Sequence, residues 1–96
     1  MASDSLTDTL ANIFGVPEYI DLGMCPSEGT VRATHYRLHR ATLTLEFFHL
    51  DKYWDESMHS DRLKECVRQG ILPAARQALW AYQQLEANGL LSLYPR

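Results

Sequence analysis

The segment from Thr30 to Leu50 contains no Gly, Pro, Asn or Asp, and these are the residues that most often form turns. A single β-strand of this length would be far longer than strands usually are. A β-hairpin would need a turn near His39 and Arg40, where none of the usual turn residues occurs. The segment therefore predicts one long helix over about residues 30–54, which ends in the polar stretch that follows.

Part of the same segment also fits a strand. Between Ala41 and Phe47, apolar residues alternate with threonine and glutamate, and threonine favours strands. A fold with two strands between residues 30 and 50 is therefore the alternative. In that alternative, simple alternation along a strand would separate Glu46 from the histidines His35, His39 and His49.

A helix over residues 30–54 would be apolar on two faces, because hydrophobic residues recur at helical spacing in two stripes. One stripe comprises Tyr36, Leu43, Phe47, Leu50 and Trp54, and the other comprises Leu38, Ala41, Leu45 and Phe48. The remainder of the chain contains too few residues to cover both faces of this helix comfortably. We therefore expect this helix to form the centre of a bundle or an interface with another chain.

Shorter helical patterns flank this segment, each with a capping or stop residue. The expected helices are Ser5 to Phe14, a turn from Glu18 to Leu22, Ser60 to Gln69 before Gly70, and Pro73 to Asn88 before Gly89. The expected fold class is all-α, a small bundle of three principal helices in one domain, residues 1–96. An acidic arm over residues 1–29 would precede the long helix, and an apolar tail over residues 90–96 would follow the last one.

Composition narrows the functional classes. The net charge of -3 provides no general attraction for nucleic acid or an anionic membrane. The two cysteines, Cys25 and Cys66, do not form a disulfide framework. Neither a signal peptide nor an apolar run long enough to span a bilayer is evident. The prediction is a cytoplasmic protein with reduced thiols and no cofactor.

Charge is unevenly distributed along the chain. Residues 1–29 contain Asp and Glu but no Lys or Arg. The next residues include a basic patch, Arg32, Arg37 and Arg40, beside His35 and His39. We expect the acidic arm to fold back on this patch; the alternative is that the arm and the patch each bind a partner.

The long helix would carry one candidate metal site. At about 100° per residue, one polar stripe would contain His35, His39, Glu46 and His49. His35 and His39 have the i, i+4 spacing that allows two imidazoles to share an ion, and Glu46-x-x-His49 has the spacing of bundle carboxylate sites. These positions would extend over about 20 Å of helix, so they could not all bind one ion. A solvated polar face is the simpler interpretation, and a metal-binding protein is kept as an alternative.

A second alternative comes from the segment Ala81 to Leu91. It contains Leu85-Glu86-Ala87-Asn88-Gly89-Leu90 and resembles the end of the recognition region of GntR-type winged-helix regulators. In that family the helix ends in Leu-Glu-x-x-Gly-Leu before the first wing strand. The resemblance implies a DNA-binding regulator.

No combination of nucleophile, base and orienting group is evident in the sequence, so an enzyme is not expected. The main prediction is a small interaction protein that binds another protein or a second copy of itself. The residues expected to contact the partner are Tyr36, Phe47, Leu50, Trp54, Leu91, Leu93 and Tyr94.

Overall fold

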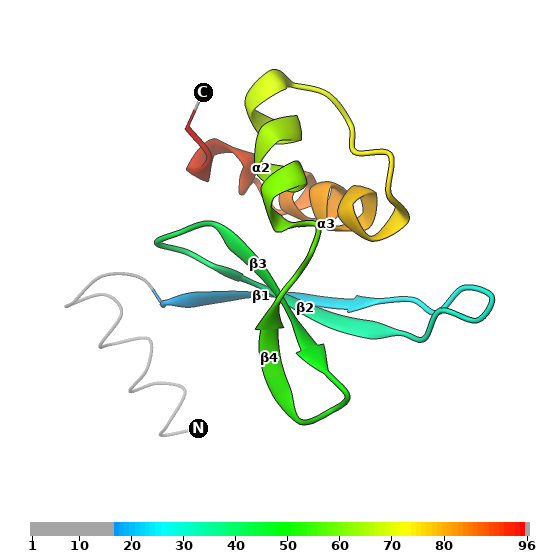
Figure 1. The fold of residues 1–96 in the computed structure, drawn as a ribbon. Coiled ribbons are helices and arrows are strands. Elements are labelled where there is room, and N and C mark those ends of the chain that lie inside the picture. Colours follow the sequence, from blue (N-terminus) through cyan, green and yellow to red (C-terminus); the bar gives the residue numbers. More distant parts are fainter. Residues whose placement is uncertain (1–16, 96) are drawn as a thin grey trace.

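The structure, a computed structural model, describes residues 17–95 as an antiparallel four-stranded sheet with two helices on one face (Figure 1). The strands are β1 (Tyr19–Cys25), β2 (Thr34–His39), β3 (Thr44–His49) and β4 (Tyr53–Glu56), and their order in the sheet is their order in the chain. The helices are α2 (Ser60–Gln69) and α3 (Arg76–Ala87), followed by the 3-10 turn η1 (Leu91–Leu93). The fold class is therefore α+β, and the predicted all-α bundle is wrong.

The predicted helix over residues 30–54 is replaced by β2, β3 and the start of β4, because the chain turns without the usual turn residues. Between β2 and β3, Leu43 adopts a φ of 59° and donates its N–H to the carbonyl of His39 at 2.7 Å. The ring Nδ1 of His39 lies 3.0 Å from the hydroxyl of Thr42 and accepts from the Thr42 N–H at 3.3 Å. Side-chain hydrogen bonds thus stabilise a turn that contains no Gly or Asn.

The turn between β3 and β4 is also formed by non-glycine residues. Leu50 and Asp51 have φ values of 51° and 56°, and the Lys52 N–H donates to the carbonyl of His49 at 2.9 Å. Two central residues with positive φ are the requirement of a type I′ hairpin turn, which normally selects Asn-Gly. Leu is rare in this conformation, so the sequence does not reveal the turn.

The N-terminal predictions have two outcomes. The helical turn predicted from Glu18 to Leu22 is wrong, because Tyr19–Cys25 is strand β1, which pairs with β2. Residues 19–25 of the acidic arm therefore belong to the sheet. The helix predicted from Ser5 to Phe14 lies outside the described residues.

The two C-terminal helices were identified from local signals. The prediction for α2 is confirmed, and Gly70 ends it with a left-handed φ of 71°. The last helix is confirmed, but it begins at Arg76 rather than at Pro73 because Ala75 is still extended. It ends at Ala87, just before the predicted end.

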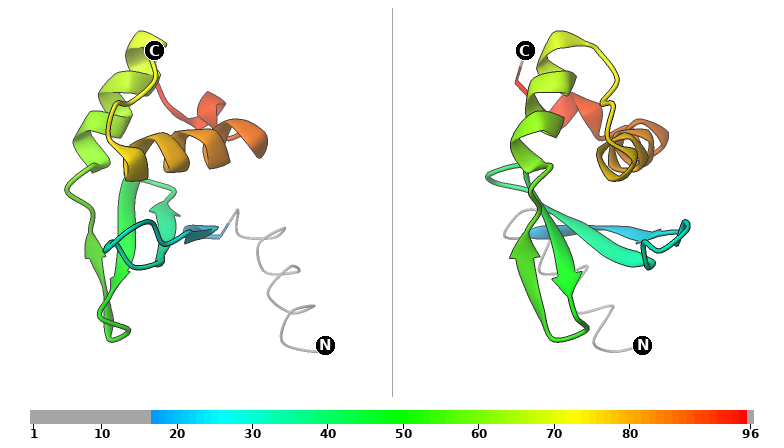
Figure 2. Two further views of the ribbon diagram at one scale, coloured as in Figure 1. Left: turned by 90° about the vertical axis from the view of Figure 1, so that its right-hand side faces the viewer. Right: turned by 45° about the vertical axis from the view of Figure 1, so that its right-hand side comes forward.

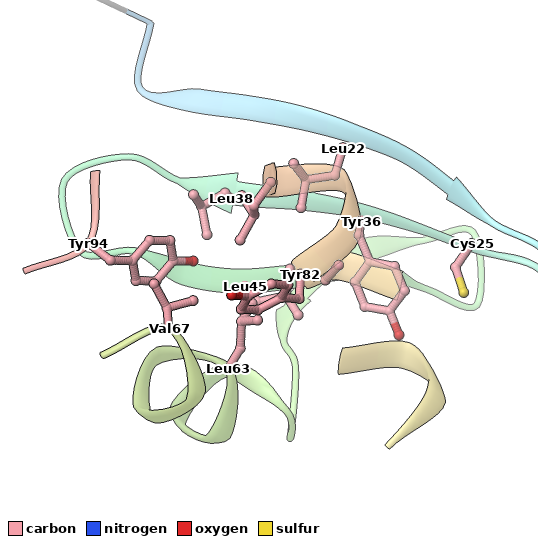
Figure 3. Packing of buried hydrophobic residues seen from close by; sticks show 11 residues of the cluster. Leu22, Cys25, Tyr36, Leu38, Leu45, Leu63, Val67, Tyr82 and Tyr94 are labelled. Carbon is pink, nitrogen blue, oxygen red and sulfur yellow. The ribbon is translucent and has the colours of Figure 1, made fainter. Parts of the chain in front are cut away.

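The sheet and the helices share one core (Figures 2 and 3). Strand alternation sends Tyr36, Leu38 and Leu45 toward the helices, where they meet Leu63 of α2 and Leu85 of α3. Tyr94 of the C-terminal tail packs into the same core and is 4% exposed. Burial of each large apolar side chain contributes about 1.5–3 kcal/mol. This core holds α2 and α3 against the inner face of the sheet.

No helix between residues 17 and 95 is both long enough and apolar enough to cross a membrane.

Candidate functional site

The face of the sheet that points away from α2 and α3 is covered by no other element within residues 17–95 (Figures 1 and 2). We call it the outer face. The strand register assigns to it every residue that alternates with the core positions. These residues are Tyr19, Asp21 and Met24 of β1; His35, Arg37 and His39 of β2; Thr44, Glu46 and Phe48 of β3; and Trp54 and Glu56 of β4.

The centre of the outer face is a stack of one guanidinium and two aromatic rings. The Cζ of Arg37 lies 3.7 Å from the ring centroid of Tyr19 and 4.2 Å from that of Trp54. The Nε of Arg37 donates to Glu46 at 2.7 Å, and both of these side chains are about four-fifths buried. Each cation–π contact contributes about 0.5–2 kcal/mol, depending on how far solvent is excluded from it. The stack and Glu46 together connect β1, β2, β3 and β4 and hold Arg37 in one orientation.

Two histidine–carboxylate pairs lie beside the stack. His35 Nε2 is 2.6 Å from a carboxylate oxygen of Asp21, and His39 Nε2 is 3.0 Å from one of Glu18. The hydrogen bond from His35 lowers the pKa of Asp21, and the backbone N–H of Gly23 acts in the same direction. The first pair joins β1 to β2, and the second joins β2 to the residue just before β1.

Trp54 also contacts one ring on β2 and one on β3. Its ring centroid is 5.0 Å from that of His35 and 5.3 Å from that of Phe48. A shallow hollow of about 230 Å³ lies here, lined by Tyr19, Asp21, His35, Arg37 and Trp54. The outer face therefore presents a preformed aromatic surface with one fixed cation and carboxylates around it.

The predicted metal stripe is divided in the structure. His35, His39 and Glu46 share the outer face, but they bind Asp21, Glu18 and Arg37 respectively. His49 lies on the other face of β3. Within residues 17–95, no three His, Cys, Asp or Glu residues are placed to hold one metal ion.

The expectation that Glu46 would lie opposite His35 and His39 in a two-strand fold is also wrong. The turn between β2 and β3 contains four residues, and the register pairs Arg37 with Glu46 and Tyr36 with Phe47. Paired residues point to the same face, so even-numbered residues of β3 share a face with odd-numbered residues of β2. Alternation counted as if residues 30–50 were one strand does not reveal this exchange of odd- and even-numbered positions between β2 and β3.

The residues predicted to contact a partner lie in three environments. Tyr36 and Tyr94 are buried in the core at 5% and 4% exposure, and Phe47, Leu91 and Leu93 are partly buried against it. Trp54 lies on the outer face. Leu50 is 57% exposed in the β3–β4 turn. The apolar stripe expected on a long helix does not exist as one surface.

The predicted basic patch is distributed among several ion pairs. Arg32 pairs with Asp51 at 3.6 Å, Arg37 pairs with Glu46, and Arg40 lies at the start of the β2–β3 turn. The carboxylates of the acidic arm that the structure describes contact His35, His39 and Arg76. The described carboxylates of the arm thus pair with the histidines of the patch and with α3, but with none of the three arginines of the patch.

The segment that resembles a winged-helix regulator ends differently from that family. After α3 the N–H of Leu90 donates to the carbonyl of Leu85 at 2.8 Å, and the 3-10 turn η1 follows. In the described part of the chain, no wing strand comes after this helix. Leu90 and Leu91 instead pack against the core.

Sequence reasoning did not identify Glu18, Tyr19 and Asp21 as site residues. They join Arg37, His35 and His39 only through the antiparallel pairing of β1 with β2, across a connection of eight residues. No spacing along the chain indicates that pairing. The available signal was the group of carboxylates upstream of a group of histidines and arginines.

Comparison with models of protein families, with curated proteins and with solved structures gives no significant match.

Proposed function

We propose that this chain is a small non-enzymatic interaction module that binds a partner protein through its outer face. The observation that carries the proposal is the Tyr19–Arg37–Trp54 stack on a sheet face that no other described element covers. Trp, Tyr and Arg dominate the binding energy of protein interfaces. Because the stack and Glu46 already fix Arg37, binding would cost little further side-chain entropy.

The charge of the outer face favours a basic partner surface. Its carboxylates outnumber its single arginine, Arg37, which is already neutralised by Glu46. Asp21 and the adjacent Glu18 have side chains that are 70% and 66% exposed. A partner with an apolar centre and Lys or Arg at its rim is complementary to this arrangement, whereas a phosphate backbone is not.

Two further features support a binding role in the cytoplasm. Burial raises the pKa of the Cys25 thiol, which disfavours the thiolate that a nucleophile requires. Cys25 and Cys66 are both free and buried, as is common for thiols of proteins in a reducing compartment.

The proposal is tested by site-specific photocrosslinking in cells of the source organism. A benzophenone amino acid replaces Tyr19 on the outer face in one variant and Leu72 in the loop between α2 and α3 in the other. Both positions are exposed, at 37% and 64%. We expect a crosslinked protein partner only from position 19. Binding of the purified partner to the unmodified chain should weaken with salt and fall about 30-fold or more with Trp54→Ala, as at an interface hot spot.

Equal crosslinking from both positions would contradict the proposal, and so would a purified partner whose affinity is unchanged by Trp54→Ala. Circular dichroism of the Trp54→Ala variant provides the folding control. Arg37→Met offers a second variant, because it retains much of the side-chain length while removing the cation.

A further inference from the structure

The hollow on the outer face has two large aromatic residues and one carboxylate in its lining. Tyr19 of β1 and Trp54 of β4 supply the aromatic surface, and Asp21, His35 and Arg37 complete the lining. Its volume of about 230 Å³ is below the range of about 300–1,000 Å³ that is usual for small-molecule sites. A single long side chain of a partner therefore suits the hollow better than a cofactor or a metabolite does.

Asp21 uses only one of its two carboxylate oxygens within residues 17–95. Its Oδ1 accepts the backbone N–H of Gly23 at 2.9 Å and lies 2.6 Å from Nε2 of His35. Both contacts are made by the same oxygen, and in the described part of the chain no group is hydrogen-bonded to Oδ2. Because the two contacts fix the orientation of the carboxylate, Oδ2 is an acceptor that needs little further ordering to bind a donor.

The charge that remains unbalanced at the hollow is that of Asp21. Arg37 is paired with Glu46 at 2.7 Å, and with a neutral imidazole the Asp21–His35 pair keeps its negative charge. The hydrogen bond from His35 lowers the pKa of Asp21, so this carboxyl is ionised at neutral pH, and its side chain is 70% exposed. A cation is therefore the complementary group, because a hydrogen bond between ionised partners is about twice as strong as a neutral one.

The single available oxygen of Asp21 favours an ammonium over a guanidinium. A guanidinium binds a carboxylate best through two parallel hydrogen bonds, one to each oxygen. Oδ1 already has two partners, so only an end-on contact through Oδ2 is left for a guanidinium. The compact ammonium of lysine needs only one acceptor, and its four-carbon stem packs along apolar surface such as the rings of Tyr19 and Trp54.

We propose that the hollow binds a lysine side chain of the partner protein. The stem of the lysine lies against the rings of Tyr19 and Trp54, and its ammonium donates to Oδ2 of Asp21. This inference rests on the proposed outer-face function, and it names the group that anchors the partner there.

The first test needs no partner and uses n-butylammonium, which reproduces the lysine side chain, as the probe. It is titrated into the full chain while the nuclear magnetic resonance spectrum is recorded. We expect saturable shifts of the indole N–H of Trp54 and of the amide of Asp21, with a dissociation constant in the millimolar range. Butylguanidinium should bind more weakly than butylammonium does. Butyrate tests the opposite assignment, in which a partner carboxylate binds Arg37, and it should produce no saturable shift.

A pair of variants assigns the binding to Asp21. Asp21→Asn keeps an Oδ1 acceptor for Gly23 and His35 but replaces Oδ2 by a donor, so it should weaken butylammonium at least tenfold. The matched control is Asp61→Asn, which removes the same charge at an exposed position in α2 and should leave the affinity unchanged. Unchanged amide resonances outside the hollow show that each variant is folded. The comparison of the three probes on the unmodified chain tests the inference even if a variant fails to fold.

The second test uses the partner captured by photocrosslinking from position 19. A water-soluble carbodiimide joins a carboxylate to a primary amine in direct contact, with loss of water, but does not join it to a guanidinium. Mass spectrometry should then identify an amide bond between Asp21 and one lysine of the partner. Replacing that lysine by methionine should weaken binding about tenfold or more, and Asp21→Asn should then cause little further loss, as expected for two groups in contact.

The outcomes separate this inference from the outer-face function. If a partner is captured from position 19 but Asp21→Asn leaves its affinity within twofold, the lysine anchor is wrong and the outer-face function stands. If butylammonium binds as expected but no partner is captured, the outer-face function is wrong although the hollow accepts an ammonium. Tighter binding of butylguanidinium or butyrate, or no saturable shift with butylammonium, would overturn the inference whatever the partner experiments show.

Discussion

The guanidinium of Arg37 lies between the rings of Tyr19 and Trp54, and its Nε is bonded to Glu46. These contacts need a planar cation with a directed donor, which lysine does not provide. At the scale of single residues, the outer face is therefore specified by the shape of Arg37 as much as by its charge. The two aromatic rings hold the guanidinium in one orientation.

Tyr94 presents a different situation, because its buried hydroxyl has no hydrogen-bond partner among residues 17–95. Burial also raises the pKa of this phenol well above its ordinary value. Removing an unpaired buried hydroxyl avoids its desolvation cost, so Tyr94→Phe should leave stability unchanged or raise it by about 1 kcal/mol. Urea unfolding measures the difference. A loss of more than about 1 kcal/mol would show that the hydroxyl is satisfied in solution.

Asp21 should make the stability of the protein depend on pH in the acid range. Its hydrogen bond with His35 lowers the folded-state pKa below the ordinary value of 3.8. The resulting stabilisation is complete above the unfolded-state pKa and is lost as the pH falls through the folded-state pKa. Urea midpoints between about pH 2 and pH 6 should therefore decline less steeply on acidification in Asp21→Asn than in the parent chain. Parallel curves for the two proteins would contradict this expectation.

At the scale of elements, the hairpin turns carry conformations that their sequences do not favour. Leu43, Leu50 and Asp51 all have positive φ. The β2–β3 turn compensates with the hydrogen bonds between His39 and Thr42, and Leu43 packs against the core. Leu50 in the β3–β4 turn is not part of that core.

The double substitution Leu50→Asn with Asp51→Gly should stabilise the protein. Asn-Gly accepts positive φ at both central positions, and the left-handed conformation costs other residues about 1–2 kcal/mol each. Part of that gain is lost with the Arg32–Asp51 ion pair, which is exposed and weak. We expect a net gain of about 1–2 kcal/mol in urea unfolding. A less stable protein would mean that the turn is not strained.

The junction between the sheet and α2 depends on Ser60, the first residue of α2. Its hydroxyl accepts the N–H of Leu45 at 2.9 Å, and Ser60 is 1% exposed. Ser60→Ala would leave that buried N–H without an acceptor and should cost about 1–3 kcal/mol. The control is Ser92→Ala, whose hydroxyl makes an exposed bond at 3.4 Å. Equal unfolding free energies for the two variants would exclude this role of Ser60.

At the scale of the whole molecule, the sheet and both helices unfold together if they share one core. Cys25 lies in β1 and Cys66 in α2, and both thiols are buried. We therefore expect Ellman's reagent to label them slowly in the native protein and with the same dependence on urea. Mass spectrometry of the labelled peptides follows each thiol separately. Earlier labelling of Cys66 would show that α2 opens independently of the sheet.

The helices α2 and α3 were predictable because their signals are local. Gly70 terminates α2 in a left-handed conformation, and Gly89 follows α3 with a φ of 69°. Apolar residues at helical spacing, such as Leu63 and Val67 in α2, identify the buried face of each helix. For such elements the amino-acid sequence contains both the periodicity and the stop signal.

The sheet was not predictable in the same way. The absence of turn residues between Thr30 and Leu50 favoured a helix, but side-chain hydrogen bonds and tolerated left-handed leucines form the turns. The alternation of apolar and polar residues from Ala41 to Phe47 favoured a strand, but the absence of turn residues favoured a helix more strongly. A turn that depends on tertiary context cannot be recognised from residue type alone.

The candidate site depended even more on tertiary structure. Trp54 was already a candidate from the sequence, but its neighbours Tyr19, Asp21 and Arg37 come from two other strands. The sequence by itself determined the two helices, much of the apolar core and the uneven distribution of charge. Only strand pairing decided which of those charges and rings meet, because contacts between strands depend on register and turn geometry rather than on local periodicity.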